Sequence, residues 1–540
     1  MSEISSLTKE LIERYQSWYN SSTSKEGVST IHVDEVASKV AKFYEKIKGV
    51  VDWREEHLLR KRAIERSLKR RIFLEENNTK KIAESLVYEL IRGGHFPNDK
   101  IPETKIEDIQ FILDKFFFII SNFSPKKQKE FFIVRSWLLE VISYEIEKNL
   151  SPTDREEALI DFMTEIMKKR IKIQEGAIKV GSSFSEEEKD IQIYIAVQKA
   201  LFKFDDATIS YYLLEKMYPQ WRLDNLKKQE LDFSLSSLAK EIFLIKEKID
   251  KTIHHPISEK FFNICEKYNT PYLLLGDIIS DNPLKAEENF SNPEKLEFLI
   301  KKFYEKRLER LKGRITRSAI YSTLSVFITK IAVALAIEVP LDKYLVGSFN
   351  KFALLINTIF PPLLMFGLVS TVKTPDKKNL QRVIVEVMKI CYQTEREDIY
   401  EIRIPKKRNK IFEVIISIFY AVAFLFSFGL IIKGLQKLHF SIFSMIIFVF
   451  FISVISFLGV KIREQSKELT VEEKKEGFIR TIIDFFTMPI VLAGKWFSER
   501  WSKMNIALII AILIDMPFLT FVEFLEQWRY FIKEQKEKIH

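Results

Sequence analysis

The pattern of hydrophobic and polar positions divides the chain into two unlike parts. Residues 1–310 carry apolar positions three and four residues apart among many charges, which is typical of amphipathic helices. Alternating apolar and polar runs, which would indicate strands, are scarce there. Between Ser318 and Val460 the pattern changes to four nearly uninterrupted apolar stretches. The predicted fold class is therefore all-α, with a large helical domain followed by a bundle of transmembrane helices.

Each apolar stretch is long enough to cross a bilayer. An α-helix rises ~1.5 Å per residue, so roughly 20 apolar residues cover the hydrocarbon core. A buried helix of a soluble protein can be apolar all round, but four such runs in close succession are more than one globular core hides. The predicted transmembrane region covers 311–460, with a loop at 373–410 and spans near 318–337, 352–372, 411–432 and 440–460.

Local signals in the first domain predict where helices begin and end. Residues 109–123 are rich in Phe but short and interrupted by Asp114 and Lys115, which favours a buried core helix over a span. Ser185 and Glu188 have the spacing of a capping box, which begins a helix. The glycines and proline of residues 93–98 predict a turn. Residues 176–185, rich in Gly and Ser, are the candidate boundary between two lobes.

Two segments near the C-terminus are less regular. Residues 478–496 contain Asp484 and Pro489, and residues 505–522 are apolar except for Asp515. Together, 478–528 form either two further crossings or an amphipathic interfacial or re-entrant pair. Two crossings would export a basic loop at 495–503, against the preference of such loops for the cytoplasm, so we favour the interfacial pair.

Lysine and arginine positions predict the orientation. Basic residues precede the first span, fill the 373–410 loop and follow the fourth span, whereas the other two loops are poor in them. Since basic flanks are retained in the cytoplasm, the first domain, the 373–410 loop and a Lys-rich tail at 529–540 are predicted to be cytoplasmic. The formal net charge of +10 fits attraction of these flanks to anionic lipid, so nucleic-acid binding is not expected.

Lys330 is the first candidate for a functional residue within the membrane. An ammonium group in hydrocarbon costs at least ~2.5 kcal/mol, and Lys330 lies too deep in its span to reach the interface. It therefore needs a partner or a wet cavity, and an ion pair between helices competes with an ion path as the explanation. The candidate counter-charges are Glu413, Asp484 and Asp515. Glu338 and Asp342 are placed at the outer edge without a role.

Pro361 and Pro362 are the second candidate feature. They remove two backbone donors from the second span, which predicts a kink or break near mid-membrane. Broken helices expose carbonyl groups to ions in transporters, although kinked helices also occur without transport.

Signatures of catalysis and metal binding are missing. The sequence contains no Walker loop, no GxGxxG after a strand, no GxSxG and no HExxH. His254, His255 and Cys265 match no metal-ligand spacing. No enzyme activity, catalytic residue, cofactor or metal is therefore expected. The basic run from Arg60 to Arg71 is either a solvated helix face or a surface for phosphate or lipid.

Several whole segments carry a family resemblance. They are LIRGGHFPNDKIPE, FDDATISYYLLEKMYP, RSAIYSTLSVFITKIAVALAIEVPLDKY, FPPLLMFGL, FGLIIKGLQKL and IDMPFLTFVEFLEQWRYFIKE. In these the chain resembles a family of multi-pass membrane proteins of small-genome candidate-phylum bacteria that has no assigned activity. The resemblance implies a bacterial cytoplasmic membrane location and transfers no catalytic residue.

Two functional hypotheses follow. We prefer a membrane-anchored scaffold or interaction protein, because over half the chain is predicted helical domain without a catalytic constellation. Its partners would be the lipid bilayer and another protein, and oligomerisation is compatible with the sequence. The alternative is an ion or small-solute channel or transporter that uses Lys330, the Pro361–Pro362 break, Asp484 and Asp515.

Overall fold

The computed structural model describes residues 4–23, 29–33, 56–74, 78–173, 185–222, 228–346, 351–392, 398–402, 410–471, 478–503 and Trp528. The chain forms two compact units. The first contains Met1–Pro293 with Met388–Ile404, and the second contains Glu294–Val387 with Pro405–Leu513. The first unit ends before the expected position 310, because the helix that enters the membrane region already begins at Pro293.

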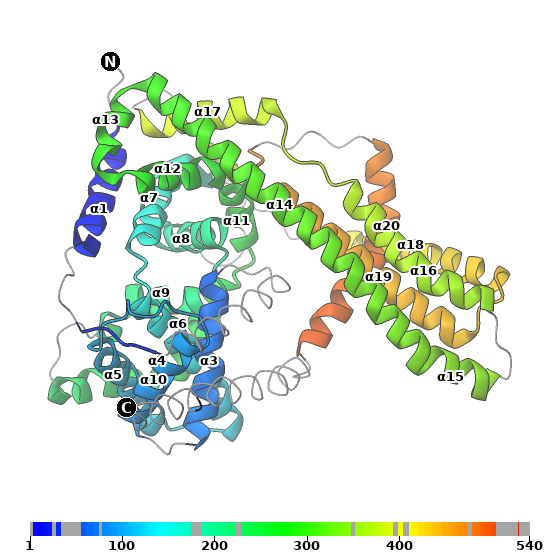
Figure 1. Cartoon of the computed structure of the whole chain (residues 1–540), viewed down its shortest axis with the longest axis horizontal. Coiled ribbons are helices and arrows are strands. Elements are labelled where there is room, and N and C mark those ends of the chain that lie inside the picture. Colours follow the sequence, from blue (N-terminus) through cyan, green and yellow to red (C-terminus); the bar gives the residue numbers. More distant parts are fainter. Residues whose placement is uncertain are drawn as a thin grey trace, which may run out of the picture. The chain divides into compact units, whose positions relative to one another are not determined.

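The first unit is built almost entirely from helices (Figure 1). In chain order its elements are α1 (Ser6–Thr23), α3 (Glu56–Leu74), α4 (Thr79–Arg92), α5 (Lys105–Asn122), α6 (Gln128–Leu150), α7 (Asp154–Arg170), β1 (Ile171–Ile173), α8 (Glu186–Phe202), α9 (Asp206–Met217), the 3₁₀ turn η1 (Pro219–Trp221), α10 (Lys228–Ile253), α11 (Ser258–Lys267), α12 (Asn269–Asp281), the 3₁₀ turn η2 (Pro283–Lys285), α13 (Ala286–Ser291) and β2 (Tyr400–Ile402).

These helices pack in two groups around apolar faces. One group contains α3, α4, α5, α6, α9 and α10, and the other contains α1, α7, α8, α11, α12 and α13 (Figure 1). Amphipathic periodicity explains the packing, since α4 buries Ile82, Leu86 and Leu90 at helical spacing. Helix α6 is buried over most of its circumference, because α3, α5, α9 and α10 all contact it.

Local predictions for the first unit hold. The Phe-rich segment forms α5, with Ile109, Phe116 and Ile119 buried. The Ser185–Glu188 capping box is formed at the start of α8. Helix α4 ends at Arg92, and Gly94 follows with φ 74°, a conformation that favours glycine. Most of the candidate boundary at 176–185 lies outside the described residues.

The segment at 373–410, expected to be a loop, contains regular structure. Residues Lys377–Cys391 form α17, and β2 pairs in parallel with β1, Ile171 opposite Tyr400. The Tyr268 ring stacks on Tyr400 with centroids 4.6 Å apart. Sequence periodicity could not indicate this sheet, because each strand has three residues and their partners lie far apart along the chain.

The second unit holds the helices expected in the membrane. They are α14 (Pro293–Val333), the π-helical segments η3 (Ala334–Glu338) and η4 (Asp342–Val346) with the short α15 (Val339–Leu341) between them, α16 (Lys351–Ser370), α18 (Lys410–Lys437), α19 (Ile442–Ser466) and α20 (Phe478–Lys503). Among the described residues, four helices are long and apolar enough to cross a membrane, within Pro293–Tyr344, Lys351–Ser370, Val414–Lys437 and Ile442–Ser466. The four predicted spans are thus confirmed in length and composition.

The apolar surface of these helices is largely uncovered by protein. Only 17% of the most apolar stretch of α18 is buried, and Phe419 and Leu425 stand out from it. Helices that are apolar all round and exposed to this extent are suited to a surrounding of lipid and not of water. The chain is a multi-pass membrane protein by this criterion.

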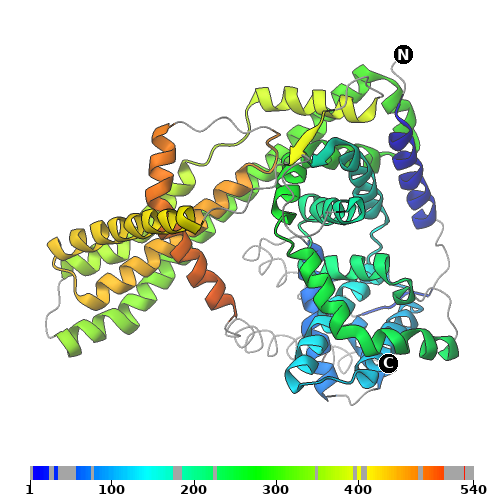
Figure 2. The same cartoon turned by 180° about the vertical axis from the view of Figure 1, so that it is seen from behind.

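Helix α20 packs across the span helices α18 and α19 (Figures 1 and 2). The Ser427 hydroxyl of α18 donates to the Phe486 carbonyl of α20 at 2.7 Å. Gly494 of α20 approaches the Ser453 carbonyl of α19. Ser427 and Ser453 both lie well away from the ends of their helices, α18 and α19. The interfacial, re-entrant or spanning assignment of 478–528 stays a prediction, and residues 504–527 lie outside the described part.

Candidate functional site

A cleft of about 830 Å³ opens on the first unit where four helices converge. Helices α5, α6, α7 and α9 supply most of its wall, and Arg222, just after η1, completes it. Its charged lining consists of the carboxylates Glu107, Asp108, Glu145, Asp154, Glu157 and Glu215 and the cations Lys105, Lys115, Lys148 and Arg222. We call this feature the acidic cleft, because six carboxylates face four cations.

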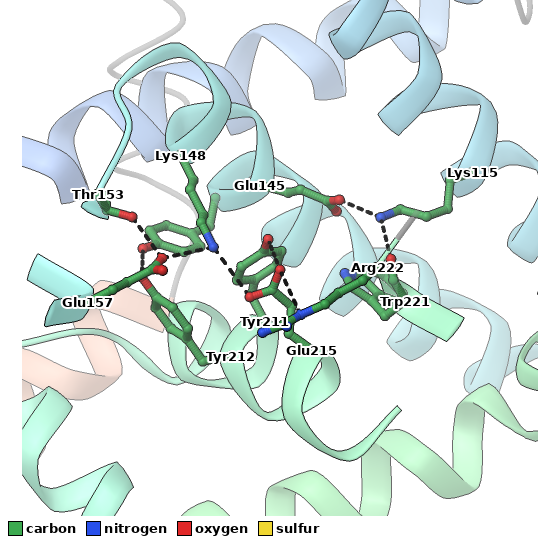
Figure 3. Close-up of polar contacts among 11 residues, drawn as sticks. Lys115, Glu145, Lys148, Thr153, Glu157, Tyr211, Tyr212, Glu215, Trp221 and Arg222 are labelled. Carbon is green, nitrogen blue, oxygen red and sulfur yellow. Dashed lines mark hydrogen bonds and ion pairs between the residues drawn. The ribbon is translucent and has the colours of Figure 1, made fainter. Parts of the chain in front are cut away.

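Lys148 lies at the centre of the charge network (Figure 3). Its Nζ is 2.8 Å from Glu157 Oε1 and 3.3 Å from Glu215 Oε2. The same ammonium group lies 5.1 Å from the Tyr211 ring centroid and 5.3 Å from that of Tyr212, within cation–π range. Lys148 thus ties α6 to α7 and α9.

Glu157 is held from several sides. The hydroxyl groups of Thr153 and Tyr212 donate to its Oε1 at 3.1 Å and 3.2 Å. Tyr212 in turn shares a 2.7 Å hydrogen bond with the buried Tyr144. Because these partners come from α6, α9 and the start of α7, the carboxylate orientation is fixed by packing as well as by charge.

Lys115 forms a second ion pair on the same wall. It bonds to Glu145, and its Nζ lies 3.4 Å from the Trp221 carbonyl and 4.3 Å from the Trp221 ring centroid (Figure 3). Arg222 is held more loosely, with its Nε 3.8 Å from Glu215 Oε1 and 59% of its side chain exposed.

Burial and charge set the protonation of the cleft. Burial raises the pKa of Glu145, and the ammonium of Lys115 limits that rise. Burial alone would lower the pKa of Lys148, but Glu157 and Glu215 outweigh it, so the pKa stands above that of free lysine. Burial, with Glu145 and Glu215 adding to it, raises the pKa of Tyr211. Lys148 is therefore charged at neutral pH, and Tyr211 donates its hydroxyl hydrogen to Glu215 at 2.7 Å.

A second polar cluster lies between the membrane helices. Lys330 Nζ is 3.1 Å from Glu338 Oε2, and both side chains are completely buried. Lys330 also lies 5.0 Å from the Phe451 ring centroid. The side-chain amide of Asn357 on α16 donates to Glu338. We call this the intramembrane polar cluster; its members are Lys330, Glu338, Asp342, Asn357, Ser441 and Ser444.

The remaining members of the cluster connect it to α19. Ser441 Oγ donates to Asp342 Oδ1 at 2.5 Å, and Ser444 Oγ donates to Asp342 Oδ2 at 3.2 Å. Ser441 is also the N-cap of α19, accepting from the Ser444 amide. Asn357 Nδ2 lies 3.4 Å from the Ser444 carbonyl. The cluster therefore joins α16 and α19 to the π-distorted end of the first span.

The partner of Lys330 differs from every residue expected from the sequence. Glu413 lies in α18 with its side chain outside the described part, and Asp515 lies outside it altogether. Asp484 lies on α20. Glu338, expected at the outer edge without a role, is the counter-charge instead.

Helix α16 is continuous from Lys351 to Ser370, with Pro361 and Pro362 buried inside it. The break expected at these prolines is therefore not formed, and the alternative, a kink, stays a prediction. The missing amide donors cost two hydrogen bonds, but the flanking turns and the packing of α16 on α19 keep the helix together.

The structure also describes His254, His255 and Cys265, which match no metal-ligand spacing. Cys265 is fully buried, and Nε2 of His254 lies 3.3 Å from Asp206 Oδ2. These three residues form no common ligand set. No group of three metal-ligating side chains occurs among the described residues.

The basic run on α3 is neutralised largely inside the first unit. Arg60 bonds to Glu147 at 2.7 Å and Lys61 to Asp205 at 2.6 Å, while Arg70 and Arg71 share Glu89. Lys61 is buried, whereas Arg62 and Lys69 are exposed, so only part of the run is a solvated face, and a surface for phosphate or lipid stays a prediction.

Comparison with known proteins gives no relative. No protein-family model, curated protein or solved structure matches the chain.

Proposed function

We propose that this chain is a membrane-anchored interaction protein. The second unit anchors it in a bacterial cytoplasmic membrane, and the acidic cleft of the first unit binds a partner protein. The observation that carries the proposal is the cleft itself, because its volume of about 830 Å³ lies in the range of ligand sites and its charged walls come from four helices. Its cations are each close to a carboxylate, which suits recognition of charged groups.

The proposed orientation places the first unit and both ends of the chain in the cytoplasm. It rests on the basic residues that flank the spans and on the loops 339–351 and 433–439, which hold two lysines each. The bacterial cytoplasmic membrane rests on the resemblance of whole segments to multi-pass proteins of candidate-phylum bacteria.

Cysteine labelling tests this orientation. Both natural cysteines, Cys265 and Cys391, are buried, so an introduced exposed cysteine reports its own position. Tyr344→Cys lies at the loop end of the first span, where Tyr344 is 79% exposed, and Asp154→Cys lies on the acidic cleft. In intact bacterial cells a membrane-impermeant maleimide is expected to label Tyr344→Cys, and to label Asp154→Cys only after lysis. The reverse pattern would show the first unit outside.

Blocking the cleft tests the proposed interaction. Asp154→Cys carrying a bulky maleimide adduct is compared with Glu187→Cys carrying the same adduct on the exposed start of α8. Affinity capture from detergent-solubilised membranes and cytosol is expected to return one reproducible partner with the Glu187 adduct and to lose it with the Asp154 adduct. Capture that repeatedly returns no protein partner, or that is indifferent to the Asp154 adduct, contradicts the proposal.

Ion or small-solute carriage by the second unit is the alternative function. One observation favours it: the Lys330–Glu338 pair is buried within a span, where ionisable residues often serve ion or proton paths.

A further inference from the structure

The wall of the acidic cleft has two carboxylates and two single oxygen atoms without a partner among the described residues. Glu107 and Asp154 are exposed carboxylates that take part in no ion pair there. Glu145 Oε2 and Asn149 Oδ1 are buried oxygen atoms without a hydrogen-bond partner. Glu145 and Asn149 lie four residues apart on α6, so they share one face of that helix. Buried acceptors are normally satisfied, so a ligand that brings hydrogen-bond donors would complement this wall.

The cations of the cleft, in contrast, each lie within 4 Å of a carboxylate, and Arg222 is the most loosely held. Lys105 lies 2.9 Å from Asp108, Lys115 bonds to Glu145, Lys148 is held by Glu157 and Glu215, and Arg222 lies 3.8 Å from Glu215. A phosphate or an acidic peptide would have to break these pairs and enter beside six carboxylates. The uncommitted groups are acceptors, so the incoming ligand must bring donors and positive charge.

The cleft already shows how it holds such groups. Lys115 lies between the Glu145 carboxylate and the Trp221 ring, and Lys148 lies between Glu157 and the rings of Tyr211 and Tyr212. A carboxylate on one side and an aromatic face on the other is a favourable environment for an ammonium or guanidinium group. At Glu215 an incoming cation can replace Arg222, because Arg222 is loosely held and more than half exposed.

We infer that the acidic cleft binds ammonium and guanidinium groups, and that its ligand is a lysine- or arginine-rich segment of the partner protein. This inference rests on the proposed function and specifies the chemistry of the same site. Glu107 and Asp154 receive the incoming charges at the rim. Glu145 Oε2 and Asn149 Oδ1 are buried, so a group that enters more deeply donates to them only after the side chains that cover them rotate away.

The test uses the full chain in nanodiscs of phosphatidylcholine, a lipid without net charge. Acetyl-tetralysine amide is the probe, with acetyl-tetraglutamate amide and spermidine as comparisons, and binding is measured by isothermal titration calorimetry. We expect saturable binding of the tetralysine that weakens as salt rises, and no binding of the tetraglutamate. The double variant Glu107→Gln/Asp154→Asn should weaken tetralysine binding about tenfold. Both residues are exposed and unpaired among the described residues, so the variant leaves the internal ion pairs intact.

Glu187→Gln is the matched control, since it removes one exposed carboxylate far along the chain from the cleft. Loss of tetralysine binding in this control, absence of binding to the unaltered chain, or tetraglutamate binding would overturn the inference. Tighter binding of spermidine than of tetralysine would overturn the protein segment as the source of the cation. If tetralysine does not bind but cleft-dependent capture of a partner persists, the proposed function stands and only the cationic chemistry is refuted.

Discussion

Glu338→Gln is expected to lower the apparent Tm of the full chain in detergent by roughly 10 °C, and Lys330→Met by a similar amount. Each change leaves one charge of a completely buried pair without its counter-charge, which costs about 3–5 kcal/mol. The double variant Lys330→Met/Glu338→Gln should recover most of the loss, because it removes both charges and keeps an acceptor for Asn357. Fluorescence-detected size-exclusion chromatography after heating measures all three.

Lys343→Met is the matched control for this cycle. Lys343 follows Asp342 in the chain and is exposed, so the same change of side chain should leave the apparent Tm unaltered. If the losses of the two single variants simply add in the double variant, Lys330 and Glu338 do not interact and the intramembrane polar cluster is wrong.

The double variant also separates the two functional hypotheses. A folded chain without the Lys330–Glu338 pair is reconstituted in liposomes beside the unaltered chain. If the pair is structural, any ion flux of the unaltered chain persists in the double variant. Flux that disappears while the fold is retained would favour carriage through the second unit over the membrane-anchor role.

The sequence predicted the membrane helices well and the partner of Lys330 poorly, for a physical reason. Long apolar runs specify spans by length and composition alone. The pairing of Lys330 with Glu338 depends on helix phase, since eight residues of regular α-helix rise ~12 Å and leave a rotation of roughly 80° between the two positions. The wider π turn over Ala334–Glu338 reduces that rotation, and two long side chains span the rise. No residue type in that segment predicts a π turn from the sequence.

The acidic cleft could not be predicted for a different reason. Its charges come from four helices and the residue after η1, and each looks like an ordinary surface charge in its own segment. The basic run from Arg60 to Arg71 shows the same limit. Its partners Glu89, Glu147 and Asp205 lie on or beside other helices, so a run that looks solvated in sequence is partly buried in the fold.

The contact of α20 with α19 depends on one glycine. A Cβ atom at Gly494 would overlap the Ser453 carbonyl and lie 3.0 Å from Phe457 Cβ. Small residues let helix backbones approach closely in membranes, and here the approach leaves no room for a methyl group. The obstacle is backbone, so a side-chain rotation cannot relieve it.

Gly494→Ala is therefore expected to lower the apparent Tm by roughly 5 °C, since overpacking costs about 1–3 kcal/mol. Gly434→Ala on α18 is the matched control, because nothing lies within 4 Å of its added Cβ. Alanine is the better helix former by ~1 kcal/mol, so this control should leave the apparent Tm unchanged or raise it. A loss of apparent Tm at Gly494 without a loss at Gly434 separates the effect of the helix contact from the helix propensity of alanine. Equal changes of apparent Tm in the two variants would mean that α20 does not cross α19 at Ser453. Residues 478–503 would then lie away from the middle of the bundle.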